Sequence, residues 1–125
     1  MARRRLDGEM AVLLLDSITE IRPEDAGCVV VSGSHGGLSA ASYAVPVPLA
    51  ICFFNDAGIG KDDAGIAGLA SLDYPAAAYS HLSARIGDPL DGWSNGLVTS
   101  VNGPAQKAGI SAGMTVAEAA LRLRP

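Results

Sequence analysis

Residues 28–37 (CVVVSGSHGG) constrain the fold of this chain more than any other segment. A cysteine and three valines in a row are typical of a strand that is covered on both faces of a sheet. Two serines, a histidine and three glycines then fill the six positions from Ser32 to Gly37. The abrupt change predicts a buried strand that ends in a turn and is followed by a helix, with polar chemistry at the end of the strand.

Similar apolar runs recur along the chain, between segments of helical character. We expect strands at residues 11–15, 28–32, 49–54, 76–79 and 97–101. We expect helices at 38–44, from 62 or 63 to 72, at 102–109 and at 115–123, a loose lead-in at 1–9 and a long loop at 82–95. The pattern predicts one α/β domain over residues 1–125, with three layers and a mostly parallel sheet of four to five strands flanked by short helices.

The link after the first strand allows two interpretations. Ser17 and Glu20 have the spacing of a capping box, so a short helix can begin there. Alternatively, residues 18–21 extend the strand into a hairpin whose turn is bracketed by Pro23 and Gly27. We expect a hairpin-like or short crossover link.

Charge and composition exclude several classes of protein. The net charge of −4 argues against nonspecific nucleic-acid binding, and the one basic cluster, residues 3–5, is expected to be a solvated terminus. No segment is long enough to cross a membrane. The two cysteines lie in apolar runs, which is typical of free thiols in a cytoplasmic protein, and no spacing indicates a metal or a cofactor. A hydrophobic content of 49% fits either a well-buried core or a subunit interface, and we expect a homo-oligomer.

Polar residues follow the expected strands, at the edge of the sheet where parallel strands end, here called the carboxyl edge. In open parallel sheets ligands bind outside this edge, so the following residues are expected to converge there: Asp16, Ser17, Ser32, Ser34, His35, Asn55, Asp56, Ser80, His81, Ser83 and Arg85.

Gly36 and Gly37 allow two interpretations. Free backbone N–H groups at the start of a helix can bind a carboxylate or phosphate. Alternatively, the glycines only permit a tight turn and close packing of the helix on the sheet. The run lacks the lysine of a Walker A loop and the spacing of a dinucleotide-binding motif.

The run from Ser32 to Gly37 resembles a nucleophile elbow, the strand–turn–helix of the α/β-hydrolases. Ser34 would be the nucleophile, with Ser32 in place of the usual leading glycine. The order Ser34, Asp56, His81 also matches the order of that family's triad. The resemblance covers about ten residues and implies a covalent mechanism at Ser34; the chain is shorter than the full hydrolase fold.

His35 and His81, each preceded by a serine at the end of an expected strand, suit general acid–base work. Asp56 could orient one of them, or could instead close an Asx turn. Arg85 could hold a substrate carboxylate or phosphate, or could instead pair with Asp88 or Asp91.

We therefore expect a small, metal-independent enzyme of the hydrolase or lyase type that acts on a small anionic or carbonyl-containing metabolite. The expected catalytic residues are Ser34, His35, Asp56 and His81, and the expected substrate-binding residues are Gly36, Gly37, Asn55, Ser80, Ser83 and Arg85. The alternative is a non-catalytic subunit that binds a ligand or a partner at the same edge.

Overall fold

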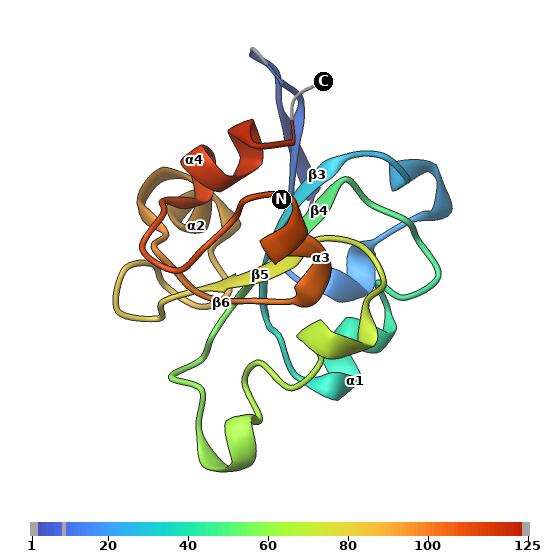
Figure 1. The fold of residues 1–125 in the computed structure, drawn as a ribbon. Helices are drawn as coiled ribbons and strands as arrows, with labels where there is room; N and C mark the ends of the chain where they lie inside the picture. Colours follow the sequence, from blue (N-terminus) through green and yellow to red (C-terminus); the bar gives the residue numbers. More distant parts are fainter. Residues whose placement is uncertain (1–2, 9, 124–125) are drawn as a thin grey trace.

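The computed structural model describes residues 3–8 and 10–123, which form a sheet flanked by short helices (Figure 1). The strands are β1 (Arg3–Leu6), β2 (Val12–Leu15), β3 (Val29–His35), β4 (Ile51–Asn55), β5 (Ala76–Tyr79) and β6 (Val98–Val101). The α-helices are α1 (Leu38–Ser42), α2 (Pro89–Asn95), α3 (Gly103–Lys107) and α4 (Val116–Leu121). The prediction of an α/β fold is confirmed.

The order of the strands in the sheet follows their order in the chain. Strands β2, β3, β4 and β5 are parallel neighbours, whereas β1 pairs antiparallel with β2 and β6 pairs antiparallel with β5. The expectation of a mostly parallel sheet of four to five strands is therefore wrong, because the described residues form six strands in a mixed sheet.

The missed strand is β1, which lies in the expected lead-in. Its three arginines give no apolar signal, but an edge strand tolerates charge because only one of its sides is paired. Arg3 forms an ion pair with Asp25 and Arg5 forms one with Asp7, both at 2.9 Å. Residues 1, 2 and 9 of the expected lead-in lie outside the described residues.

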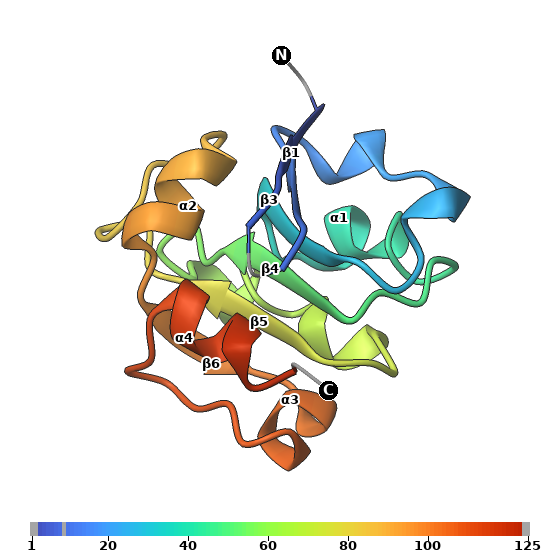
Figure 2. The ribbon, with the colours of Figure 1, turned by 90° about the horizontal axis from the view of Figure 1, so that it is seen from above.

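Helices and turns cover both faces of the sheet (Figure 2). The links between consecutive parallel strands all pack on one face, where Ile18, Ala41 and Leu69 belong to one apolar cluster. A sheet whose strands follow chain order has this property, because crossovers of one hand lie on the same side. The opposite face is covered by α2, α3 and α4, and its cluster includes Phe53 and Tyr79.

Two expected segments have a different structure. The helix expected up to residue 72 is replaced by two 3₁₀ turns, Lys61–Asp63 and Leu69–Ser71, because positive φ angles at Asp62 and Asp63 interrupt any helix. The loop expected at 82–95 contains α2, whose first turn is capped by the Asp88 carboxylate accepting the Asp91 N–H.

The caps predicted for the last two helices are confirmed. Asn102 caps α3, and Thr115 with Glu118 forms the capping box of α4. Ser17 likewise caps a 3₁₀ turn at Ile18–Glu20, which lies within a crossover between the parallel strands β2 and β3. Across the described ranges, no helix has the length and apolar character needed to span a membrane.

Candidate functional site

The chain leaves β4 and β5 toward opposite faces of the sheet. The segment after β4 leads to Leu69, in the cluster on the α1 face, whereas the segment after β5 leads to Trp93 of α2, on the other face. Ligands of open α/β sheets bind where the chain leaves two neighbouring strands toward opposite faces in this way. Asp56 and His81 stand at that point, one and two residues after the strand ends.

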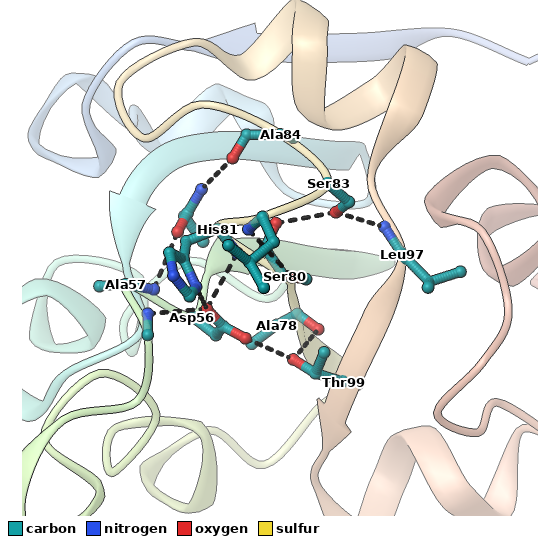
Figure 3. A network of polar contacts seen from close by, with 12 residues as sticks. Asp56, Ala57, Ala78, Ser80, His81, Ser83, Ala84, Leu97 and Thr99 are labelled. Carbon is teal, nitrogen blue, oxygen red and sulfur yellow. Dashed lines mark hydrogen bonds and ion pairs between the residues drawn. The ribbon is translucent and has the colours of Figure 1, made fainter.

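The Asp56 carboxylate joins residues from three strand ends (Figure 3). Its Oδ1 accepts the backbone N–H groups of Gly58 and His81, at 2.9 and 3.0 Å, and lies 3.2 Å from His81 Nδ1. Its Oδ2 accepts the Thr99 hydroxyl at 2.9 Å. Asp56 is only 4% exposed, so these four contacts replace the water that an ionised carboxylate would otherwise bind.

The hydrogen bonds decide the charge of Asp56. Burial alone raises the pKa of this carboxyl, but the donors from Gly58, His81 and Thr99 lower it, and the net pKa lies below the ordinary value for aspartate. Asp56 is therefore a carboxylate at neutral pH. Both interpretations of Asp56 have structural support, since it closes an Asx turn onto Gly58 and also contacts His81.

The contact with Asp56 orients the His81 ring. A carboxylate only accepts hydrogen bonds, so Nδ1 of the neutral ring carries the proton and Nε2 carries the lone pair. The side chain is 44% exposed. Gly58 packs beside the ring, since a Cβ added there would lie 3.4 Å from His81 Cε1. The geometry thus leaves the His81 ring partly exposed to solvent and places a buried carboxylate behind it.

The loop that leads away from Asp56 is strained. Six of the seven residues 57–63 have positive φ, including the β-branched Ile59 at 67°. Each such non-glycine residue costs about 1–3 kcal/mol and persists only where the surroundings impose it. Strain of this kind clusters at functional sites, and here it lies in the loop that places the Gly58 N–H on Asp56.

The polar side chains at the end of β3 accept hydrogen bonds from backbone N–H groups. Ser34 Oγ accepts the Ile18 N–H at 2.9 Å, and Ser34 N–H donates to Ser32 Oγ at 2.9 Å. Among the described residues Ser34 makes no hydrogen bond to a histidine. His35 Nδ1 accepts the Gly37 N–H at 3.0 Å, so the proton of its neutral ring lies on Nε2, the reverse of His81.

The two glycines after His35 donate their N–H groups within the protein. Gly36 N–H donates to Gly65 O at 2.8 Å, and Gly37 N–H donates to His35 Nδ1. A Cβ at Gly37 would lie 2.7 Å from Ala64 O. These contacts support the interpretation of a tight turn with close packing, and they occupy the N–H groups of Gly36 and Gly37 themselves.

The remaining predicted binding residues fall into two places. Asn55, Ser80 and Ser83 brace the backbone: Asn55 is buried and donates to Ala84 O, Ser80 Oγ accepts the Leu82 N–H, and Ser83 Oγ donates to Ser80 O. Arg85 lies apart from them and lines a cavity with Asp16 and Asp88. Its guanidinium forms no ion pair with Asp88 or Asp91, although its backbone N–H donates to Asp91.

Sequence reasoning missed Thr99. Thr99 occupies an outward position of β6 and reaches Asp56 only because β6 turns back antiparallel beside β5. No local pattern indicates that pairing. Among residues 3–8 and 10–123, no group of three histidine, cysteine, aspartate or glutamate side chains gathers to hold a metal ion.

Comparisons of the chain with protein-family models, with curated proteins and with solved structures found no match. The function is therefore argued from the site itself.

Proposed function

We propose that this chain is a small enzyme of the hydrolase or lyase type that performs acid–base chemistry on a small anionic or carbonyl-containing metabolite. The observation that carries the proposal is the contact of His81 Nδ1 with the buried, ionised Asp56 at the point where β4 and β5 diverge. A histidine backed by a carboxylate, with its other nitrogen free, is a common general base.

In the proposed reaction His81 transfers the proton, and Asp56 holds the His81 ring in position. Nε2 takes a proton from the substrate or from a water molecule, and the ring later returns it to the leaving group. The Asp56 carboxylate stabilises the imidazolium that forms in between and stays ionised itself. His35, whose Nε2 carries its proton, could donate a hydrogen bond to a substrate carbonyl.

The alternative is a subunit that binds a partner at the same edge. Leu82 follows His81 and is 86% exposed, and a large apolar side chain in that position suits a protein interface. We also propose that the chain forms a homo-oligomer. The exposed side chains of Leu38, in α1, and Tyr43, directly after it, support this proposal. Cytoplasmic residence is supported by the free thiols of Cys28 and Cys52.

The proposal is tested by turnover of simple substrates. Wild-type protein is incubated in D₂O with a panel of oxo acids, hydroxyketones and sugar phosphates, and deuterium uptake beside the carbonyl is followed by NMR. Hydrolysis of p-nitrophenyl esters is followed in parallel. We expect His81→Gln to reduce the rate on any active substrate by at least about 10²-fold, the usual contribution of a general base.

The controls separate chemistry from folding. His81→Gln keeps the backbone N–H that donates to Asp56, so the turn itself is preserved. Asp73→Asn removes an exposed carboxylate elsewhere on the surface and should retain the wild-type rate. Turnover that survives His81→Gln would contradict the proposed base, and no turnover across the panel would favour the binding subunit.

A further inference from the structure

A cavity of about 720 Å³ lies between the β1–β2 pair and the segment that leads into α2. Leu14 and Pro89, both buried, contribute apolar wall. Four charged residues line it: Arg4, Asp16, Arg85 and Asp88. Neither Asp56 nor His81 contributes to its lining, so an argument for this cavity is independent of the proposed acid–base site.

The alternation of side chains along β1 separates Arg4 from its neighbours. Successive side chains of a strand point to opposite faces, so Arg3 and Arg5 share one face and Arg4 takes the other. Arg3 and Arg5 both form ion pairs at 2.9 Å. Within the described part of the chain, Arg4 has no carboxylate within ion-pair distance, and neither does Arg85.

The wall that carries Arg85 is held in place. The Gly87 N–H donates to Gly33 O at 2.8 Å, and the Arg85 N–H donates to the Asp91 carboxylate at 2.8 Å. The Asp88 carboxylate accepts the Asp91 N–H as the cap of α2. A ligand would therefore meet a wall that is already ordered, which reduces the entropy lost on binding.

Two arginines and two aspartates thus line one cavity without forming ion pairs with one another. We infer that the cavity binds a small organic acid that also carries an amine or a hydroxyl group. The acid group would bind Arg4 and Arg85, for which a planar guanidinium is well suited. The amine or hydroxyl would donate to Asp16 or Asp88, and the apolar walls would take the carbon chain.

The test measures dissociation constants by calorimetry for three sets of probes: 2-hydroxy acids (lactate, malate), amino acids (alanine, aspartate) and inorganic phosphate. We expect one of the two organic sets to bind more tightly than phosphate. Arg4→Ala and Arg85→Ala should each weaken that binding at least tenfold. Arg5→Ala is the matched control, since Arg5 lies on the other face and pairs with Asp7, and it should bind like wild type.

Asp16→Asn distinguishes the two organic sets. An amide still accepts a hydrogen bond from a hydroxyl but has no charge for an ammonium group, so amino acids should lose far more affinity than hydroxy acids. Phosphate binding as tight as the best organic acid, binding unchanged in both arginine variants, or no binding of any probe would each overturn the inference. None of these results depends on His81, so the two proposals fail separately.

Discussion

The polar side chains at the end of β3 and the carboxylate that follows β4 differ in how far their hydrogen bonds reach along the chain. At the end of β3, Ser32 and His35 accept the backbone N–H groups two residues further on, and Ser34 accepts the Ile18 N–H, 16 residues away. Around Asp56, the partners His81 and Thr99 lie 25 and 43 residues away. The first region is one continuous run of the sequence, whereas the residues of the second come together only when the sheet forms.

A dense local motif can therefore serve the turn that contains it. Serines, histidine and glycines satisfy the backbone where a strand changes direction, and they need no substrate to explain them. A buried carboxylate that collects donors from three strand ends is harder to explain as a turn alone. We therefore propose Asp56 and His81 as the site of the chemistry and the end of β3 as its support.

Gly33→Ala tests whether the end of β3 is such a support. A Cβ at Gly33 would lie 2.6 Å from Asp16 O and 2.7 Å from the Gly87 carbonyl carbon, and neither backbone segment can move cheaply. Gly33→Ala should lower the free energy of unfolding by about 2–3 kcal/mol, measured by urea denaturation. Gly103→Ala, where the added methyl group meets open space, should change it by less than about 0.5 kcal/mol. Equal stability of the two variants would contradict a supporting role for the end of β3.

Asp56→Asn examines the other region. The substitution removes an ionised acceptor from four hydrogen bonds and should cost about 1.5–3 kcal/mol of unfolding free energy at pH 7, with Asp73→Asn as the neutral control. The pKa of Asp56 is lowered in the folded state, so its contribution is complete above the unfolded pKa of about 3.9 and is lost as the pH falls through the lower folded value. The difference in unfolding free energy between the wild type and Asp56→Asn should therefore become smaller below about pH 4. A gap that stays constant down to pH 2 would show that Asp56 contributes packing instead of charge.

The sequence predicted the parts of the fold that depend on local pattern. The apolar run at Ala76–Tyr79 and the capping box of Thr115 with Glu118 match the structure residue for residue. The sequence did not predict β1, because a run of arginines has no strand pattern of its own and becomes a strand only by pairing with β2. For the same reason Asp56 and His81 could be nominated from their places at strand ends, whereas Thr99 and Arg4 could not.

Tyr79→Phe tests a side-chain hydrogen bond that joins the two regions. The buried Tyr79 hydroxyl, from the end of β5, donates to Ser32 O at the end of β3 at 2.7 Å. Burial raises the pKa of Tyr79, so the hydroxyl keeps its proton and remains a donor. Its removal should cost about 1 kcal/mol in urea denaturation, because a buried carbonyl loses its donor. Tyr74→Phe is the matched control. It removes a buried hydroxyl that donates to Ala44 O on the other face of the sheet, so it gives the loss of unfolding free energy for a bond outside both regions.

Ser34→Ala tests which of the two regions carries the chemistry. Ser34→Ala removes the acceptor of the Ile18 N–H and should lower the unfolding free energy by about 0.5 kcal/mol, less than for Tyr79→Phe, because Ser34 is only partly buried and water can replace the hydroxyl. If the chemistry belongs to Asp56 and His81, any turnover found in the substrate panel should stay within about twofold of the wild-type rate in Ser34→Ala. The wild-type protein should also resist labelling at Ser34 by a fluorophosphonate, which reacts with activated serines. A loss of turnover in Ser34→Ala, together with labelling of the wild-type protein at Ser34, would show that Ser34 is a nucleophile. The covalent step would then start at the end of β3, and the chemistry would belong to that region instead of to Asp56 and His81.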